Sequence, residues 1–432
     1  MIEDTLLVVQ PVSNGPSEKI GILAGDRIIA VNDSAIAGVK MSTEEIMKRL
    51  RGPKGSKVNL KIVRRGVQDP LVFTVKRDKI PILSLDASYM IQPKTGYIRI
   101  NRFGATTAEE FKKAMTSLQK QGMKDMILDL QGNGGGYLNA AIDLANEFLD
   151  QKELIVYTEG RTAKRSDFYA KGNGEFRNGR LIVLVDEYTA SASEIVSGAV
   201  QDWDRGIIVG RRSFGKGLVQ RPIDLPDGSM IRLTIARYYT PAGRCIQKPY
   251  DSSTDYNKDL IERFNHGELM NADSIHFPDS LKVQTKKLGR TVYGGGGIMP
   301  DYFVPIDTTL YTDYHRNLVA KGAVIKFTMQ FIEGHRKELA NKYKKFESFN
   351  EKFIIDDDML ATLREMGEKE GVKFNEEQYQ KSLPLIKTQL KALIARDLWD
   401  MNEYFRVMNT TNESIQKALE ILNSDEYQKK LK

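Results

Sequence analysis

The chain has 432 residues, of which 41% are hydrophobic and 28% are charged, as is ordinary for globular protein. Its formal net charge is +7, but 64 basic and 57 acidic side chains are interspersed without an arginine-rich block, which argues against nucleic acid as a partner. A single cysteine, Cys245, excludes an intrachain disulfide. The sequence contains no run of about 18 apolar residues and therefore predicts no membrane-spanning helix.

The first 79 residues predict a small β-rich module. Its expected strands are Thr5–Val9, Arg27–Val31, Val58–Val63 and Leu71–Val75, which are separated by turn-forming residues. A helix is expected over Ser42–Leu50, because Ser42 is suited to cap its first turn. The first strand begins abruptly and no secretory signal precedes it, so we expect the module to be truncated at its N-terminus.

Residues 80–305 alternate strands with amphipathic helices, a pattern typical of an α/β domain with parallel strand pairing. The expected strands are Gly96–Ile100, Met126–Leu130, Leu181–Val185, Gly206–Val209, Leu218–Ile223 and Met230–Tyr239. The expected helices are Thr107–Gln121, Leu138–Phe148 and Glu194–Trp203. A charged insertion is expected near residues 248–290.

Residues 306–432 predict a helical C-terminal domain with many charged side chains. Ile415, Ala418 and Leu422 share one helix face, and another helix is expected just after Pro384, a residue tolerated in a first helical turn. Such helices fit a homo-oligomer interface, a surface for an adaptor protein, or a solvated bundle, and the sequence leaves these alternatives open.

The candidate nucleophile is a serine between a buried strand and a helix. Ser191 lies where the helix after Leu181–Val185 begins, and unpaired N–H groups together with the helix dipole favour a nucleophilic oxygen and an oxyanion there. Ser193 is a second candidate on the residues alone. The run from Ser191 to Glu194 also fits a capping box, in which the two side chains only satisfy the first helical amides.

The candidate general base is a lysine. All four histidines lie outside the strand–turn–helix segment, whereas Lys216 lies between glycines and precedes an apolar pair. Burial favours an uncharged amine because the charged form loses hydration, although a solvated surface lysine is the commoner alternative. Gln220, four residues on, is placed to orient the amine as the third member of a triad does.

Two glycine-rich segments are candidates for binding loops. Gly210 to Lys216 matches the start of a phosphate-binding loop, but Gly217 replaces the magnesium-binding hydroxyl and a strand is expected to follow, so nucleotide binding is not expected. The run Gly134–Gly136 follows a buried strand, and its amides are candidates for half of an oxyanion site. A plain tight turn is the alternative.

Seven motifs occur in an order that resembles the carboxyl-terminal (tail-specific) processing protease family, over roughly residues 5–305. They are Pro16–Asp26, Leu50–Gly55, Gly96–Ile100, Asp129–Gly136, Thr189–Glu194, Phe214–Gln220 and Tyr238–Arg244. The resemblance implies a PDZ-like module, a crotonase- or ClpP-like α/β core and serine endopeptidase activity. It implies no metal and no organic cofactor.

The resemblance also implies the roles of particular residues. Ser191 corresponds to the nucleophile, with Lys216 and Gln220 completing the catalytic set. The N–H groups of Ala192 and of one glycine, Gly134 rather than Gly135 or Gly136, are expected to bind the oxyanion. Gln131 departs from the family, which usually has arginine at this position.

The resemblance further implies protein substrates with apolar C-terminal tails and a location in, or facing, a bacterial periplasm. The tail adds as a strand to the PDZ sheet, where Ile46, Met47 and Leu50 are expected to line the groove. Ordinary core packing is the alternative for these three side chains. Two other functions remain open: a non-catalytic PDZ scaffold, and a crotonase-like acyl-transferring enzyme that binds coenzyme A and does not need Lys216.

Overall fold

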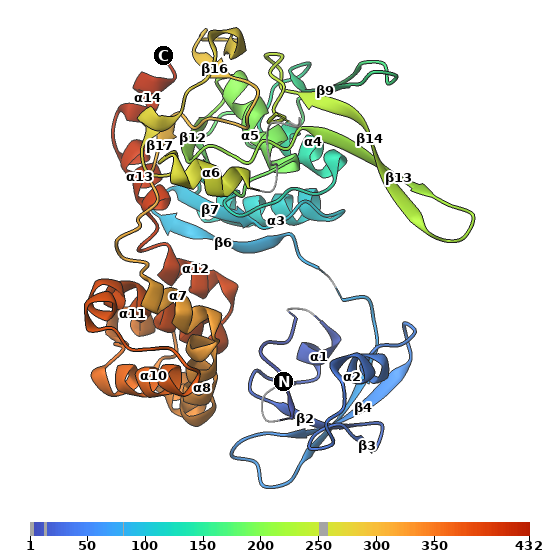
Figure 1. The fold of residues 1–432 in the computed structure, drawn as a ribbon, viewed down its shortest axis with the longest axis vertical. Coiled ribbons are helices and arrows are strands. Elements are labelled where there is room, and N and C mark those ends of the chain that lie inside the picture. Colours follow the sequence, from blue (N-terminus) through green and yellow to red (C-terminus); the bar gives the residue numbers. More distant parts are fainter. Residues whose placement is uncertain (1–3, 13–14, 81, 250–257) are drawn as a thin grey trace. The chain divides into compact units, whose positions relative to one another are not determined.

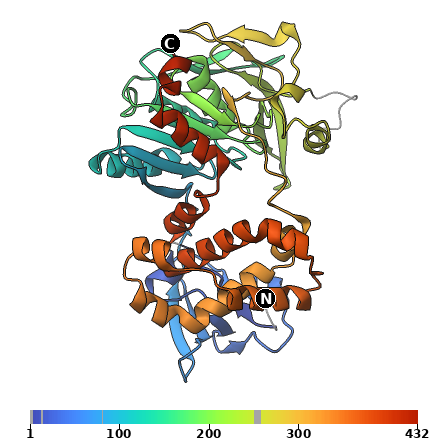
Figure 2. The ribbon, with the colours of Figure 1, turned by 90° about the vertical axis from the view of Figure 1, so that its left-hand side faces the viewer.

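The computed structural model describes residues 4–12, 15–80, 82–249 and 258–432 (Figures 1 and 2). Two predictions therefore lie partly outside the described residues. They are the truncated N-terminus of the first module and the charged insertion near residues 248–290, of which 250–257 are not described. The chain forms two compact units, residues 1–82 with 308–408 and residues 83–307 with 409–432. Among the described helices, none combines the length and the apolar composition that a bilayer crossing requires.

The first part of the first unit is a sheet of five short strands with two helices. Its elements are β1 (Leu6–Leu7), α1 (Pro16–Lys19), β2 (Arg27–Val31), β3 (Ser34–Ala35), α2 (Thr43–Leu50), β4 (Lys57–Val63) and β5 (Leu71–Lys76). Alternate residues of β4 are buried, so Val58, Leu60 and Ile62 pack with Ile46 of α2 in one core. The predicted cap is confirmed, because the Ser42 hydroxyl accepts the N–H of Glu45 at 3.2 Å.

The second part of the first unit is a helical bundle. Its helices are α7 (Asp313–Ala320), α8 (Ala323–Lys342), α9 (Phe346–Lys352), α10 (Asp357–Lys369), α11 (Glu376–Leu398) and α12 (Met401–Met408). Pro384 lies inside α11, so the prediction that a helix begins there is wrong. Burial of Ile386 and Leu390 in the bundle core outweighs the single backbone hydrogen bond that a proline removes.

Glu403 makes the stability of this bundle depend on pH. Burial, together with the nearby Asp400, raises the pKa of Glu403 from 4.5 to about 7. Because the pKa of Glu403 is higher in the folded state than in the unfolded state, its protonated form favours folding. This contribution to the free energy of unfolding is complete below pH 4.5 and is lost as the pH rises through about 7.

We expect the melting temperature of the bundle to fall by about 2–4 °C between pH 5 and pH 8 from this group, which corresponds to about 1 kcal/mol once solvent screening is allowed for. Circular dichroism melts at constant ionic strength measure the fall. Glu403→Gln should remove most of it, whereas Glu351→Gln, at an exposed position of α9, should keep it. A fall of the same size in both variants would assign the effect to other groups.

The second unit is an α/β core (Figure 1). Its strands are β6 (Leu85–Gln92), β7 (Thr95–Ile100), β8 (Asp125–Asp129), β9 (Leu154–Glu159), β10 (Ser166–Tyr169), β11 (Leu181–Val185), β12 (Ile207–Gly210), β13 (Leu218–Asp224), β14 (Met230–Tyr239), β15 (Lys282–Gln284), β16 (Thr291–Tyr293) and β17 (Tyr302–Phe303). Its α-helices are α3 (Thr107–Lys120), α4 (Leu138–Asn146), α5 (Ala192–Asp202), α6 (Asp259–Asn265), α13 (Glu413–Asn423) and α14 (Glu426–Lys430).

The central sheet of this unit has the strand order β17-β12-β11-β8-β7-β6. The pairs from β7 to β17 are parallel, as the alternation of strands and helices predicts, and β6 pairs with β7 in antiparallel fashion. Because β8 and β11 are neighbouring parallel strands, the turns that follow Asp129 and Val185 meet at the same edge of the sheet.

The last two helices belong to this core unit. Arg180 donates to the carbonyl of Leu422 at 2.8 Å, and the hydroxyl of Tyr427 accepts the N–H of Leu181 at 2.9 Å. The segment predicted as one helical domain, residues 306–432, is therefore divided between the two units. A second sheet, of order β10-β9-β14-β13, ends in the hairpin β13–β14, which projects from the core (Figure 1).

Candidate active site

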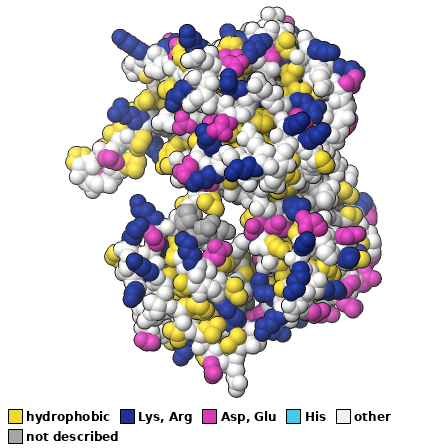
Figure 3. Space-filling view, turned by 180° about the vertical axis from the view of Figure 1, so that it is seen from behind, with side chains coloured by type: hydrophobic (Ala, Val, Ile, Leu, Met, Phe, Trp, Pro, Cys, Tyr) yellow, Lys and Arg dark blue, Asp and Glu magenta, His cyan; other side chains and the backbone are white. Residues whose placement is uncertain are grey.

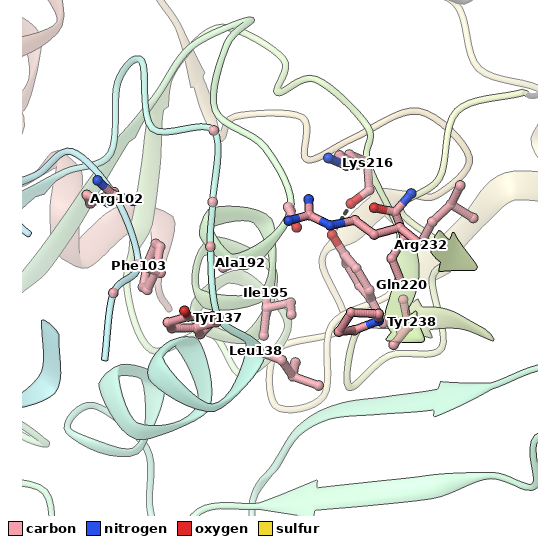
Figure 4. A pocket seen from close by; sticks show the side chains of 18 residues that line it. Arg102, Phe103, Tyr137, Leu138, Ala192, Ile195, Lys216, Gln220, Arg232 and Tyr238 are labelled. Carbon is pink, nitrogen blue, oxygen red and sulfur yellow. Dashed lines mark hydrogen bonds between the residues drawn. The ribbon is translucent and has the colours of Figure 1, made fainter. Parts of the chain in front are cut away.

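A cavity of 620 Å³ lies where the turns after β8 and β11 meet the start of β13 (Figure 4). It is lined by every residue predicted for catalysis or for the oxyanion, namely Ser191, Lys216, Gln220, Ala192 and Gly134. Further lining side chains include Arg102, Tyr137, Leu138, Ile195, Arg232 and Tyr238. The fold thus brings together side chains from three separate segments of the sequence.

Ser191 has a backbone conformation that is rare for a residue other than glycine. Its φ of 59° and ψ of −115° lie outside the ordinary helical and extended regions, so the turn is strained. Two hydrogen bonds hold it: Ala190 N–H donates to the carbonyl of Asn133 at 2.9 Å, and Ser191 N–H donates to Glu194 Oε2 at 2.7 Å. Such a sharp strand-to-helix turn presents a serine hydroxyl to a cavity.

The hydroxyls of the two candidate serines differ in their surroundings. Ser193 is buried, and its Oγ donates to the carbonyl of Asn133 at 3.0 Å. Ser191 lines the cavity and is partly exposed, and it occupies the cap position of α5, where it forms a capping box with Glu194. Of the two candidate serines, therefore, only Ser191 has a hydroxyl that is accessible from the cavity.

Glu194 links the backbone of Ser191 to that of Lys216. Its buried carboxylate accepts four hydrogen bonds, from Ser191 N–H at 2.7 Å, Lys216 N–H at 2.9 Å, Gly215 N–H at 2.7 Å and Ser213 Oγ at 2.5 Å. The first two share one oxygen, Oε2. Burial raises the pKa of Glu194, while the four donors act in the opposite direction.

The loop that carries Lys216 is held from both sides. Phe214 N–H donates to the carbonyl of Thr189 at 2.9 Å, and the hydroxyl of Tyr238 donates to the carbonyl of Lys216. Gly217 N–H donates to Gln247 Oε1 at 2.9 Å. The Lys216 side chain is partly buried and lies at the cavity wall (Figure 4).

Gln220 lies on β13, near an irregularity of the strand pair. The register between β13 and β14 shifts between Val219 and Gln220, and such a bulge re-aims side chains. Gln220 and Lys216 line the same cavity (Figure 4), and no hydrogen bond joins their side chains among the described residues. Leu218–Asp224 is a strand, so the expectation that no helix follows the phosphate-loop-like segment is confirmed.

The glycine run packs directly against the Ser191 turn. A Cβ added to Gly135 would lie 2.7 Å from Ser191 Cβ, and the φ of Gly135 is +97°, so this position requires glycine. Gly135 N–H already donates to Asn133 Oδ1 at 2.8 Å. Among the hydrogen bonds of the described residues, neither Ala192 N–H nor Gly134 N–H is a donor, and both residues line the cavity.

Gln131 is anchored by the C-terminal helix α13. Its side chain donates to Ser414 Oγ at 3.3 Å and accepts from Asn412 Nδ2 at 3.1 Å. Its carbonyl accepts from Arg99 at 2.8 Å, and Arg99 also pairs with the buried Asp129. The turn that leads into the glycine run is thereby tied to α13 and to β7, without an arginine at position 131.

The three residues predicted to line the PDZ groove differ in exposure. Ile46 is 1% exposed and belongs to the core of the module, which matches the alternative of ordinary packing for this residue. Met47 and Leu50 are partly exposed and remain candidates for the groove, and Leu50 also packs against the core of the module. Among the described residues, no group of three or more His, Cys, Asp or Glu side chains is arranged to hold a metal ion.

Sequence reasoning did not assign functional roles to Glu194 and Asn133. The spacing around Glu194 indicates only a capping box, and Asn133 belongs to what the sequence indicates only as a glycine turn. Asn133 is fully buried, and its Nδ2 donates to the carbonyl of Ile100 at 2.8 Å. Its own carbonyl accepts hydrogen bonds from the N–H of Ala190 and the hydroxyl of Ser193. Both residues follow a buried strand and stand beside small residues. This pattern was the signal in the sequence that could have indicated a role for them in the site.

Three sequence families match the chain. Peptidase family S41 matches residues 94–254, the PDZ domain matches residues 7–64, and a family of unknown function matches residues 314–400. A solved structure, the photosystem II D1 C-terminal processing protease, is 29% identical and aligns with a TM-score of 0.38 over 71% of this chain and 70% of that one.

Several curated proteins are similar in sequence, and two of them show the range of the match. The carboxyl-terminal-processing protease of Synechocystis sp. is 40% identical over 248 residues, which are 56% of this chain and little more than half (57%) of that protein. A CtpA-like serine protease of Staphylococcus aureus (strain MRSA252) is 31% identical over 369 residues, which are 83% of this chain and 70% of that protein. With the PDZ module, the α/β core and this extended match in place, the chain belongs to the carboxyl-terminal processing protease family of S41 peptidases.

Proposed function

We propose that the protein is a serine endopeptidase that processes or degrades other proteins near their C-termini. The observation that carries the proposal is the carboxylate of Glu194, which accepts the backbone N–H of both Ser191 and Lys216 beside one cavity. The family membership supports the same reaction class. Neither a PDZ scaffold nor a thioester-binding enzyme requires that the loop carrying Lys216 be hydrogen-bonded, through Glu194, to the strained turn at Ser191.

The proposed reaction is acyl transfer. The uncharged amine of Lys216 takes the proton of the Ser191 hydroxyl, whose oxygen attacks the peptide carbonyl carbon. The N–H groups of Ala192 and Gly134 stabilise the resulting oxyanion. The Lys216 ammonium then protonates the leaving amine as the carbon–nitrogen bond breaks, and Gln220 orients the lysine. Lys216, uncharged again, then takes a proton from water, whose oxygen attacks the acyl ester carbon. The ester bond breaks, and the Lys216 ammonium gives the proton to the Ser191 oxygen.

The remaining roles in the proposal follow from the family resemblance. The PDZ module engages apolar substrate tails through Met47 and Leu50 of α2, and the protein acts in, or anchored at a membrane facing, a bacterial periplasm. The helices between residues 306 and 432 serve homo-oligomerisation or an adaptor protein. No metal or organic cofactor takes part.

The test is cleavage of a denatured polypeptide with an apolar C-terminus, with fragments mapped by mass. We expect the wild type to cut it and Lys216→Ala to be at least about 10³-fold slower, because the serine loses its proton acceptor. Lys113→Ala, an exposed lysine of α3, should match the wild type.

The outcomes separate the three functions. Undiminished cleavage by Lys216→Ala contradicts the proposed mechanism. No cleavage by the wild type, with tail binding retained, favours the scaffold. A rise in melting temperature on adding coenzyme A favours the acyl-transferring enzyme.

A further inference from the structure

The hairpin β13–β14 carries an apolar face that the core does not cover. Ile223 pairs with Ile231 across the two strands, so their side chains lie on the same face. Leu233 and Ile235 share that face, because they are two and four residues from Ile231 along β14. Ile231 is 46% exposed and Leu233 is 51% exposed, and Ile223 and Ile235 are also exposed. We call these four residues the hairpin stripe. Hydrophobic side chains are visible on the projecting hairpin in Figure 3.

The opposite face of the hairpin belongs to the candidate active site. Gln220, Pro222 and Arg232 line the catalytic cavity, and the register pairs Pro222 with Arg232 and Gln220 with Thr234. The hairpin therefore turns Gln220, Pro222 and Arg232 toward the cavity, and its opposite face carries the stripe together with Arg221. A two-stranded hairpin with an unburied apolar face is marginally stable by itself in water.

The hairpin stripe is continuous with the catalytic residues. A second cavity, of 790 Å³, contains one residue of the stripe, Ile235, in its lining. Its other lining side chains are partly apolar, as Leu218 and Tyr239 are, and partly polar or charged, as Glu159, Arg161, Arg237 and Gln247 are. It shares Lys216, Leu218 and Gln220 with the catalytic cavity. The shared residues make the two cavities adjacent, so a polypeptide that leaves the catalytic cavity past Lys216 can continue into the second one and reach Ile235 of the stripe.

The edge of the hairpin is open to an added strand. Within the part of the chain that the structure describes, β13 is the last strand of its sheet and pairs on one side only, with β14. Pro222 lacks a backbone N–H, and proline at this place is compatible only with an edge strand. The remaining backbone groups of β13 can pair with an extended chain, whose alternate side chains would lie on the apolar face.

We infer that the hairpin stripe and the edge of β13 bind an extended segment of the substrate that carries apolar side chains at every second position. The inference rests on the proposed peptidase function and extends its substrate recognition beyond the catalytic cavity. The catalytic cavity extends along the hairpin to Pro222 and Arg232, which lie on the face opposite the stripe, so a peptide that fills only that cavity does not contact the stripe.

The test uses the double variant Ile231→Ser/Leu233→Ser. Its matched control is Val72→Ser/Ile354→Ser, two apolar residues that are 69% and 71% exposed in the other unit. Three substrates are compared: a four-residue chromogenic peptide, a denatured polypeptide with apolar residues alternating beside the cleavage site, and the same polypeptide with serine at those positions. The apolar polypeptide should have a KM at least about 5-fold higher with the stripe variant, while kcat/KM for the short peptide should stay within about 2-fold.

Binding separates this inference from the proposed function. Fluorescence anisotropy with the Ser191→Ala protein requires no catalysis, and the alternating peptide should bind at least about 5-fold more weakly when the stripe is also replaced. Equal binding with and without the stripe overturns the inference, whether or not the wild type cleaves anything. A stripe variant that changes the oligomeric state in size-exclusion chromatography, with unchanged peptide binding, also overturns it, because the stripe is then an interface between copies.

Discussion

Replacing Ser191 by alanine is expected to lower kcat for peptide cleavage at least about 10⁴-fold while KM changes by less than about 3-fold. The substitution removes the attacking oxygen, and what remains is the oxyanion site together with substrate binding. The strained φ of 59° at this residue is held by Asn133 and Glu194 through the backbone, so both hydrogen bonds survive in the variant.

The melting temperature of Ser191→Ala should therefore lie within about 2 °C of the wild type. Ser193→Ala is the matched control, since it removes a buried hydroxyl that donates to Asn133 at 3.0 Å. We expect that control to lose about 1 kcal/mol of stability and to keep most of its activity. The reverse pattern, with Ser193→Ala inactive and Ser191→Ala active, would assign the nucleophile to Ser193.

Replacing Glu194 by alanine is expected to have the largest combined effect on stability and activity. The change leaves three backbone N–H groups and the Ser213 hydroxyl without their acceptor in a buried place. Each unsatisfied group costs about 1–3 kcal/mol, less what water entering the vacated space recovers, so we expect a loss of about 3–5 kcal/mol. Chemical denaturation measures it.

Glu194→Gln keeps the fold and isolates the positioning role. The amide oxygen still accepts on one side, but the amide NH₂ faces donors on the other, so the Ser191 turn and the Lys216 loop move apart. We expect kcat to fall about 10²-fold with little change in KM, and Asp143→Asn, at an exposed site on α4, to behave as the wild type. A change in KM alone would show that Glu194 serves substrate binding instead.

Part of the core could be predicted because the central strands β11 and β12 are short, fully buried apolar runs. Leu181–Val185 and Met230–Tyr239 have the predicted bounds, and α3 differs by one residue. β6 and β9 were not predicted. The β6 sequence is mostly half-buried and mixes polar with apolar side chains, so it gives no clear period of two.

The candidate site was predicted in its members but not in its connections. Local sequence shows Glu194 three residues after Ser191, and this spacing alone is a capping box. The donors Ser213, Gly215 and Lys216 come from a loop 19 to 22 positions further along the chain, and only the parallel packing of β11 and β12 brings that loop to the carboxylate. Spacing along the chain does not contain that information.

The attachment of the last two helices was missed for a similar reason. The helical spacing of Ile415, Ala418 and Leu422 predicts the apolar face of α13, and that face is buried. It does not predict that α13 packs on the core unit, since an amphipathic helix fits any apolar surface. The contacts of Asn412 and Ser414 with Gln131 follow from that packing.

The most direct measurement is to trap the covalent intermediate. The wild type is mixed with an activated peptide ester, quenched in acid within milliseconds, digested with trypsin and analysed by mass. We predict one acyl adduct, on the hydroxyl of Ser191 in the tryptic peptide 181–205, and its loss in both Ser191→Ala and Lys216→Ala. Turnover of the ester with no adduct on that peptide, or with the acyl group on another side chain, would contradict a nucleophilic serine at this turn.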